Sequence, residues 1–469
     1  MEISIQQIVN NLVKNILEKA YSGGINDVDS LASDILNDCK HAATATIEAI
    51  CTDMNRQMRE DKAGRKERGL VLKEKERPRE LLTELGRLDL ARDYYYDKRN
   101  ARYVSLLDEA IGIRPYERIG DELSAKMVGL ATEISYAKSA EIAGGGLVSR
   151  QAVKNQIQKI DTLEMVPKTE TKKEVTELHI YADEDHVHMQ KPGKQKGKSS
   201  KIVPLITVTE GISKEGLGRN RTIGTMYFVD EKFDTKNLWK STEGYLAQTY
   251  DLRKVEKIFV HGDGAKWIQK GLENFPQAVH VMDGYHLEKR LRGIATKFPG
   301  RNVAFRLTKA IKSKDRKRAD EILHGLYGVA ENERERKSIT DFGTYLMGNW
   351  ERIVNRKTLN IPGSCTEAQV SHVLSQRFSR DPLGWSKEGL GKLTKLRVYI
   401  KNGGEIKASD FKRKQDDTYN EYADEILKEA ISGATDWTIF DGEPFVFDRA
   451  SGTQTLLHGI GTTKNILWS

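Results

Sequence analysis

"ELHIYADEDHVH", residues 177–188, has the residue pattern from which the fold class can be argued. Its apolar and polar residues alternate as they do in a β-strand, where successive side chains point to opposite faces. The alternation runs into three consecutive carboxylates, Asp183, Glu184 and Asp185. Ionised groups are costly on a core strand unless something compensates their charge. We therefore interpret this strand as the carrier of a functional acid, with Asp183 and Asp185 on one face and Glu184 on the other.

The residues that follow the strand are basic. Five lysines and no acid occur between residues 191 and 201, at positions 191, 194, 196, 198 and 201. A turn here would bring cations close to the substrate of the acidic strand, where they could neutralise phosphates. The expected contacts with DNA are Lys194, Lys196 and Lys198. A solvated turn without a partner is the alternative interpretation.

The pattern downstream is that of a mixed α/β domain. Three strand-like stretches follow one another, and then helix and strand alternate twice, which is the order of a ribonuclease H-like core. Residues 284–360 are helical and heavily charged, without a strand pattern, and another helix starts near Thr366. The expected strands are 177–190, 201–210, 221–229, 256–262 and 278–283, and the expected helices are 235–250 and 265–274.

Three acids fall on elements that such a core would bring together. Asp183 lies in the first strand, Asp263 just past the fourth, and Glu367 at the start of the late helix. Converging carboxylates repel one another unless cations lie between them. Hard oxygen ligands select Mg²⁺ or Mn²⁺, and two such ions can promote phosphodiester chemistry. Asp185 is the alternative to Asp183, because it points to the same face two residues later.

Other residues near these elements have two interpretations each. Asp283 and His286 follow the fifth strand, and they could orient DNA or a water molecule by hydrogen bonds from behind the ligands; alternatively, Asp283 caps the next helix. Trp385 lies among cations that include Arg377 and Lys387. This setting suits stacking on an unpaired base, with the two cations contacting DNA. Packing of Trp385 in the core is the alternative.

The N-terminal third contains a second DNA-binding candidate. Residues 1–80 show helical spacing, and residues 81–117 a β-hairpin pattern in which aromatic and basic side chains could lie on DNA or pack against each other. Residues 118–170 predict two helices separated by three glycines at 144–146, as in a helix-turn-helix unit. Ser149 would cap the second helix, which would offer Arg150, Gln151, Lys154 and Asn155 to the major groove. A helical hairpin that only packs is the alternative.

Length and composition limit the classes of protein to which this chain can belong. The chain has 469 residues, a net charge of +8 and a pI near 9, which is compatible with a nucleic-acid partner. We expect no membrane span, because no apolar run approaches the roughly 18 residues required. Three cysteines, odd in number and far apart, indicate neither a disulfide framework nor a zinc site. The default expectation is a cytoplasmic protein.

Three blocks in order carry a resemblance to a known family. "HIYADEDHVHMQ" (179–190), "VHGDGAKWIQKGL" (260–272) with "VHVMDGYHLEKRL" (279–291), and "SCTEAQVSHVLSQRFSRDPLGWS" (364–386) resemble the DDE transposases of the ISLre-type bacterial insertion sequences. They are similar, more distantly, to Mutator-like and hAT-like transposases. "RYVSLLDEAIGI" (102–113) and "SYAKSAEIAGGGLVSRQAVKNQ" (135–156) also resemble that family. The resemblance spans roughly residues 85–400.

The resemblance implies a transposase that cleaves DNA with two Mg²⁺ or Mn²⁺ ions and joins 3′-OH ends to target DNA. Its triad, and its metal ligands, would be Asp183, Asp263 and Glu367. It also implies recognition of terminal inverted repeats, at least a homodimer on DNA, and a location on the bacterial nucleoid. The alternatives are a structure-specific nuclease on the same core and a non-catalytic DNA-binding regulator derived from a transposase.

The expected organisation is an α/β ribonuclease H-like core interrupted by an α-helical insertion and preceded by helical and helix-turn-helix regions. Its parts are an N-terminal helical region for dimerisation or DNA binding (1–80), a hairpin region (81–117), a helix-turn-helix-like domain (118–170), the first part of the core (171–283), the insertion (284–360), the last core helix (361–400) and a C-terminal region (401–469).

Overall fold

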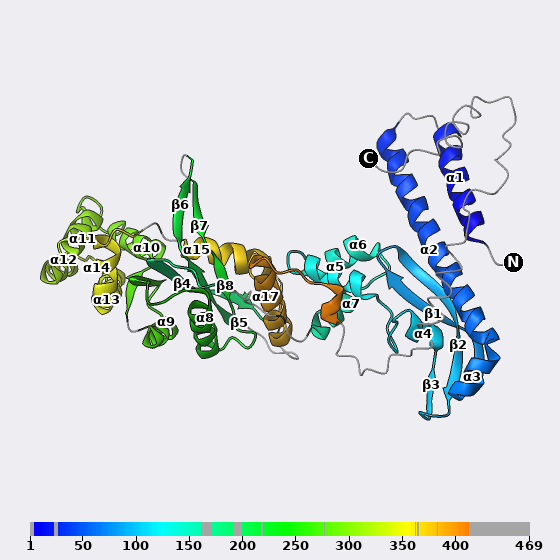
Figure 1. Cartoon of the computed structure of the whole chain (residues 1–469). Coiled ribbons are helices and arrows are strands. Elements are labelled where there is room, and N and C mark those ends of the chain that lie inside the picture. Colours follow the sequence, from blue (N-terminus) through cyan, green and yellow to red (C-terminus); the bar gives the residue numbers. More distant parts are fainter. Residues whose placement is uncertain are drawn as a thin grey trace. The chain divides into compact units, whose positions relative to one another are not determined.

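The computed structural model describes residues 4–22, 27–160, 163, 171–190, 199–216, 219–275, 277–361, 363, 365–381 and 383–411 (Figure 1). These residues divide into two compact units that meet in the sequence between Arg118 and Ile119. Each unit is described by itself. None of the helices in the described ranges combines the length and the apolar composition needed to cross a bilayer.

The first unit pairs long helices with a small antiparallel sheet. Helix α2 packs against α1 and, further along, against β2. The core between α2 and the sheet contains Met54, Met58, Leu88, Leu90 and Tyr95. The elements are α1 (Ile5–Ser22), α2 (Val28–Glu60), α3 (Lys62–Arg68), β1 (Leu70–Thr83), β2 (Gly86–Asp97), β3 (Arg102–Val104) and α4 (Leu106–Ala110).

The expectation that residues 1–80 are helical throughout is wrong from Leu70 onward. Strand β1 pairs with β2 over its whole length, from Leu70 opposite Asp97 to Thr83 opposite Gly86. The charged residues of β1 are mostly exposed, and a run of exposed charges is also typical of a solvated helix. Pairing with β2, and not this local pattern, makes the segment a strand. Within the expected hairpin region, β2 pairs with β3, which spans only three residues.

Tyrosines pack across this hairpin, as one of the two interpretations predicted. The rings of Tyr94 and Tyr103 are stacked with centroids 5.9 Å apart, and Tyr96 lies 5.2 Å from Tyr103. Lys73 and Arg77 lie over the rings of Tyr96 and Tyr94, at 5.8 and 5.1 Å. The packing of the hairpin is therefore accounted for within the first unit.

The second unit begins with three short helices, α5 (Asp121–Ala131), α6 (Tyr136–Gly144) and α7 (Arg150–Lys159), which pack on one another. The single helix expected before the glycines is divided into α5 and α6. The glycine turn and the start of α7 are confirmed: Gly145 and Gly146 have positive φ, and the Ser149 hydroxyl accepts a hydrogen bond from the Ala152 N–H at 3.2 Å.

A five-stranded mixed sheet forms the centre of the unit, in the order β10-β9-β4-β5-β8. Strand β4 is the middle strand; it runs antiparallel to β5 and parallel to β9, β5 is antiparallel to β8, and β9 is parallel to β10. The first and fourth predicted strands are thus neighbours, as expected. The strands are β4 (Glu177–His188), β5 (Ser200–Thr209), β8 (Met226–Phe228), β9 (Lys257–Gly262) and β10 (Ala278–Met282).

The third predicted strand, 221–229, is divided in two. Its first part is β7 (Arg219–Ile223), which pairs with β6 (Gly211–Glu215) in a separate two-stranded ribbon; only β8 belongs to the sheet. The ribbon projects away from the sheet in Figure 1. A Gly-rich turn between β6 and β7 is the sequence signal for this excursion.

The two faces of the sheet differ in character. One is apolar: Ile180 and Ala182 of β4 pack with Trp239 and Leu246 of α8 (Thr235–Thr249) and Ile268 of α9 (Lys266–Gly271). The other face carries His179, Tyr181 and Asp183, because side chains alternate along the strand. Polar and titratable groups are therefore concentrated on a single face of the sheet.

The residues after β10 are helical, as expected, and they form a bundle. It has its own hydrophobic core, to which Leu287, Leu307, Leu326, Leu346 and Ile353 contribute. After it, α15 packs on β4 and β5, and α17 packs on α7. The elements are α10 (Gly284–Ala295), α11 (Val303–Lys312), α12 (Arg316–Gly328), α13 (Glu333–Gly348), α14 (Trp350–Thr358), α15 (Thr366–Val370), a π-helical turn (Ser371–Ser375), α16 (Gln376–Phe378) and α17 (Lys387–Lys401).

Candidate active site

Strands β4, β9 and β10 run parallel, and in each of these segments an aspartate follows shortly after the end of the parallel pairing. Tyr181 of β4 pairs with His261 of β9, so that Asp183 and Asp263 each lie two residues further along their strands. The N–H of Asp283, directly after β10, donates to the carbonyl of Gly262 at 2.8 Å. The end of the parallel pairing, which falls within β4 and at the ends of β9 and β10, thus brings three acids to the same end of these strands.

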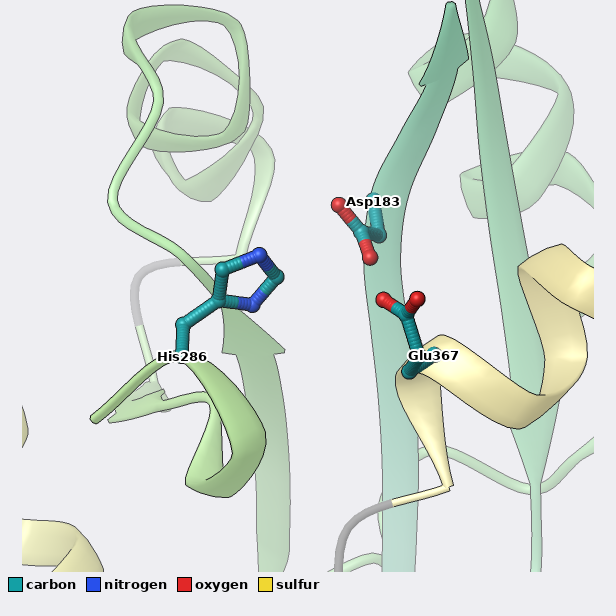
Figure 2. Close-up of side chains that lie close together, drawn as sticks. All are labelled: Asp183, His286 and Glu367. Atoms are coloured by element: carbon teal, nitrogen blue, oxygen red, sulfur yellow. The ribbon is translucent and has the colours of Figure 1, made fainter. Parts of the chain in front are cut away.

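Glu367 reaches this end of the strands from the first turn of α15. The helix is held over the polar face of the sheet: the Tyr227 hydroxyl of β8 donates to the Gln369 side-chain oxygen at 2.6 Å. Asp183, His286 and Glu367 each offer one donor atom, and these atoms all lie within 4.8 Å of one another (Figure 2). Residues from a strand, from the insertion and from a late helix therefore converge on one point.

Asp183 is the least exposed member of this group, with 7% of its surface accessible. Burial raises the pKa of its carboxyl to about 7, against the lowering effects of the Glu184 N–H and of His286; Asp263 and Asp283 raise it further. The Glu184 N–H donates to Asp183 Oδ1 at 2.9 Å. A cation bound next to this carboxyl would lower its pKa and so favour its ionised form.

His286 is oriented by Asp283. The Asp283 carboxylate is fully buried and accepts both the backbone N–H of His286 and its ring Nδ1–H, each at 3.1 Å. It thus caps α10, as the alternative interpretation predicted, and it also positions the imidazole; the orientation of DNA or of a water molecule by these residues stays a prediction. Because Nδ1 donates to a carboxylate, Nε2 is the nitrogen left for the cluster. The hydrogen bond to Asp283 raises the pKa of His286, with Asp183 and Asp263 adding to the effect.

Asp263 lies beside the cluster and not within it, among the residues that the structure describes. Its Oδ1 accepts the Ala265 N–H at 2.8 Å, at the turn that leads into α9. Its charge nevertheless contributes to the pKa of Asp183, of His286 and of Tyr345. Mutual repulsion between carboxylates favours a hydrogen bond to the backbone over a place between Asp183 and Glu367.

The two neighbours of Asp183 in the acidic run have other partners. The Ser379 hydroxyl donates to both oxygens of Asp185, at 2.8 and 3.1 Å, which holds this acid at α16 and away from the cluster. Glu184 faces the other side of the sheet, as expected, and its carboxylate accepts the indole N–H of Trp267 at 2.6 Å. Of the three acids, Asp183 is the one that joins the cluster.

Below the acids, the polar face of the sheet contains a buried histidine pair that the sequence analysis did not single out. His179 Nδ1 and His261 Nε2 are 3.0 Å apart, and His179 Nε2 lies 2.7 Å from Glu177. Tyr181 stacks on His261 with ring centroids 4.4 Å apart. Burial lowers the pKa of both imidazoles. The signal in the sequence was the alternation of His179, Tyr181 and Asp183 along one strand.

Two residues expected to contact DNA are instead part of the interior. Arg377 is 5% exposed, and its Nε–H donates to the Ala131 carbonyl at 3.0 Å. Trp385 is 6% exposed; its indole donates to the Phe378 carbonyl at 3.0 Å, and the Arg377 guanidinium lies 4.9 Å from its ring. The prediction of DNA contacts is wrong for both, and the core-packing alternative for Trp385 is confirmed.

A second buried arginine also links the turn between α5 and α6 to the helical segment that follows Glu367. Arg397 donates to the carbonyl of Thr132 at 2.7 Å and to that of His372 at 2.8 Å, and it pairs with Glu133 at 2.8 Å. Together with Arg377, it fastens the turn between α5 and α6 to the helical segment that follows Glu367. The three-helix region and the segment that follows Glu367 are therefore joined by buried hydrogen bonds within the second unit.

The other residues predicted to contact DNA are either exposed in the structure or outside the described residues. Arg150, Gln151, Lys154 and Asn155 are all exposed on α7, opposite buried Val153 and Ile157, and Lys387 is exposed at the start of α17. Their accessibility is compatible with a partner, and contact with DNA stays a prediction. Lys194, Lys196 and Lys198 lie outside the described residues.

Comparisons with known proteins place the chain among relatives without an assigned function. Two proteins of Caldanaerobacter subterraneus subsp. tengcongensis, both named as UPF0236 proteins, are similar to it. One is 34% identical over 437 residues, covering 92% of this chain and 90% of its own length; the other is 35% identical over 390 residues, covering 82% and 80%.

Among solved structures, a chain of the Drosophila P element transposase strand transfer complex is weakly similar. It is 10% identical, the match covers 69% of this chain and 94% of that chain, and the TM-score is 0.23. The model of the uncharacterised protein family UPF0236 matches residues 24–415. The chain belongs to the uncharacterised protein family UPF0236.

Proposed function

We propose that this protein is a DDE-type DNA transposase, which binds the ends of a mobile element, cleaves DNA strands and joins the freed 3′-OH ends to target DNA. The observation that carries the proposal is the convergence of the Asp183 and Glu367 carboxylates with His286, beside Asp263. Phosphodiester cleavage needs grouped acids of this kind at the surface of a domain that can hold DNA.

The order of the strands supports the same assignment. Three antiparallel strands (β4, β5, β8) followed by two strands parallel to the first (β9, β10) is the arrangement expected of a ribonuclease H-like core, with the first and fourth strands adjacent. Asp183 on the first strand, Asp263 after the fourth and Glu367 on a helix packed over the first correspond to the proposed triad. The helical bundle α10–α14 would be the insertion ahead of the third acid.

The donor set fits a hard divalent cation. Asp183 and Glu367 supply carboxylate oxygens within 4.8 Å of each other. Asp263 would join them on cation binding by leaving its hydrogen bond to the Ala265 N–H. A pair of Mg²⁺ or Mn²⁺ ions in such a site supplies Lewis-acid polarisation of the phosphodiester. The protein's own part is to hold the carboxylates, to offset their charge with His286, and to keep His286 in one tautomer through Asp283.

The exposed side chains of α7 are the proposed readers of the element ends. Arg150 and Lys154 are suited to guanine or phosphate, and Gln151 and Asn155 to adenine, in the major groove. Gln151 and Asn155 already share a hydrogen bond of 3.0 Å, which holds their amides side by side. Because α5–α7 are fastened to the catalytic elements, binding of an end by α7 would position the neighbouring DNA relative to Asp183.

The names of the relatives are consistent with a mobile element. One relative's name joins eleven numbered designations from one organism, and another's joins four. We infer that each set stands for copies of one gene. Such copy numbers are expected of an element that inserts copies of itself.

A strand-transfer assay tests the proposal. Purified protein is mixed with Mg²⁺, labelled DNA that flanks its own gene on both sides, and a target plasmid. The expected product is labelled end DNA joined to the plasmid, which requires two ends and therefore at least a dimer on DNA. Cleavage without any joined product would indicate a nuclease, and binding without cleavage in Mg²⁺ or Mn²⁺ would indicate a regulator.

A further inference from the structure

The positive charge of this protein is concentrated in one part of the helical insertion. Residues 289–318 contain twelve Lys or Arg and a single acid, Asp315, which is a net charge of +11. Because the whole chain carries +8, the remaining residues together are net negative, at −3. We call this segment the cationic segment; its cations are Lys289, Arg290, Arg292, Lys297, Arg301, Arg306, Lys309, Lys312, Lys314, Arg316, Lys317 and Arg318.

The cations of this segment face solvent. All twelve side chains are exposed. Along α11, Val303, Leu307 and Ile311 are buried in the core of the bundle, and Arg306, Lys309 and Lys312 follow at helical spacing on the outer side. Phe305, 72% exposed, lies one turn before Lys309. The helix thus presents a cationic strip with an aromatic side chain to whatever approaches it.

Internal ion pairing does not account for this charge. In the described ranges, Arg318 is the one member of the cationic segment that pairs with a carboxylate, that of Glu321 at 2.9 Å. The single acid of the segment, Asp315, caps α12, because its carboxylate accepts the Arg318 N–H at 2.8 Å. In α13 of the same bundle, by contrast, acids and bases alternate from Glu333 to Lys337.

The position of three cations opposes the folding of α12. Arg316, Lys317 and Arg318 occupy its first turn, where the helix dipole favours anions. Lys309 and Lys312 on α11 are three residues apart, a spacing at which like charges repel. An arrangement that is unfavourable in the free protein is expected where an anionic partner supplies the compensating charge.

The segment begins at the candidate active site. His286 lies in the first turn of α10, and Arg290, one turn later, lies 4.3 Å from the ring of Tyr345. Burial raises the pKa of the Tyr345 hydroxyl to about 12, against the lowering effect of Arg290, and the charges of Asp263 and Asp283 raise it further. From this point α10, α11 and the start of α12 extend the cationic segment away from the site.

We propose that the cationic segment binds the phosphate backbone of duplex DNA and guides the duplex to the acids. This inference rests on the proposed function, and it assigns to the insertion a contact that is independent of base sequence. Each phosphate neutralised by a cation releases counterions, so the binding it supplies must weaken steeply as salt is added.

The test is the salt dependence of DNA binding by the full-length protein. The probe is a labelled random-sequence duplex of about 30 base pairs, in EDTA so that cleavage plays no part, and the readout is fluorescence anisotropy across a NaCl series. The test variant is Lys309→Gln with Lys312→Gln and Lys317→Gln. The control variant is Lys236→Gln with Lys240→Gln and Lys270→Gln, three exposed lysines on α8 and α9, which cover the opposite face of the sheet from Asp183.

The test variant should lower the slope of log Kd against log salt by about 2 to 3, since each lost phosphate contact contributes about 0.9. Its Kd at about 0.1 M salt should rise at least tenfold, and the control should stay within about twofold of the wild type. Lys309→Arg with Lys312→Arg and Lys317→Arg should behave as the wild type. Equal losses in test and control variants, or an unchanged slope in the test variant, would overturn the proposal.

The outcome is separable from that of the proposed function. Weakened binding in the test variant together with an absence of metal-dependent cleavage would leave the cationic segment as a DNA-binding surface and would reject the transposase. Metal-dependent cleavage together with an unchanged salt slope in the test variant would support the transposase and would reject the cationic segment as a DNA-binding surface. Thermal unfolding of each variant, expected within about 2 °C of the wild type for exposed substitutions, shows that the comparison is between folded proteins.

Discussion

The carboxylates of Asp183 and Glu367 lie within 4.8 Å of each other, although the whole helical insertion separates them in the sequence. Asp183 lies on β4, the central strand of the sheet, and Glu367 lies on α15, a short helix that packs over that strand. Two ionised carboxylates at this distance repel each other; His286 offsets this repulsion, whereas the charge of Asp263 adds to it. The site is therefore expected to respond both to pH and to divalent cations.

The stability of the cation-free protein should depend on pH through Asp183. Its pKa is about 7 when folded and 3.8 as an ordinary aspartate, so the folded state keeps the proton to higher pH than the unfolded chain. Stability is then lost as pH rises from about 4 to about 7, by about 1.4 kcal/mol for each unit of the shift. In EDTA, Asp183→Asn should unfold at a temperature several degrees above the wild type at pH 8 and close to it below pH 4. A difference that does not change with pH would contradict this account.

Divalent cations should stabilise the wild type and not the triad variants. A cation that binds only the folded state adds about 2.7 kcal/mol at a concentration of 100 times its Kd. We expect Mn²⁺ to raise the thermal midpoint of the wild type by several degrees at pH 7.5, and to leave Asp183→Asn and Glu367→Gln within about 1 °C of their values in EDTA. Glu388→Gln, at an exposed position on α17, is the matched control and should respond as the wild type does.

His286 and Asp283 should matter for cation affinity to a smaller degree than the acids. Asp283 orients the imidazole through two hydrogen bonds of 3.1 Å, so removing either partner disorders one side of the site. Partners of this kind change metal affinity by about 10- to 100-fold. Calorimetric titration with Mn²⁺ should show such a loss for His286→Ala and for Asp283→Asn. Loss in His286→Ala alone would mean that Asp283 acts only as a helix cap.

Much of the second unit followed from its sequence. The alternation in residues 177–188 predicted β4 within two residues of its end, and the spacing of strands and helices predicted that β4 and β9 are neighbours. Asp183 and its alternative Asp185 differ in their partners, because the Ser379 hydroxyl donates to both carboxylate oxygens of Asp185. Local pattern determines these features, so the sequence is sufficient for them.

Features that depend on distant partners were not predictable in the same way. The charged residues of β1 pair with a strand that lies beyond Gly86, and no local pattern reports that pairing. Arg377 and Trp385 resemble surface residues in sequence, but carbonyl groups of α5 and α16 accept their hydrogen bonds in the interior.

Arg377 and Lys154 should separate stability from DNA binding. Arg377→Ala leaves the Ala131 carbonyl without its donor and opens a cavity beside Trp385, so it should cost about 2 to 4 kcal/mol of the free energy of unfolding. Lys154→Gln changes an exposed side chain and should cost less than about 0.5 kcal/mol while weakening binding to the element ends. Denaturant unfolding and anisotropy measure the two quantities. Unchanged stability of Arg377→Ala would contradict the buried role.

The most direct test of the central claim is metal-dependent cleavage of DNA by the wild type and by Glu367→Gln. The substrate is a plasmid with the DNA that flanks the gene on both sides, in Mg²⁺ at pH 7.5. The wild type should cut at the ends, and Glu367→Gln should cut at least about 100-fold more slowly, equivalent to about 2.7 kcal/mol of transition-state stabilisation, while binding the same DNA. Cleavage by Glu367→Gln at the rate of the wild type and of Glu388→Gln would contradict the assignment of this site.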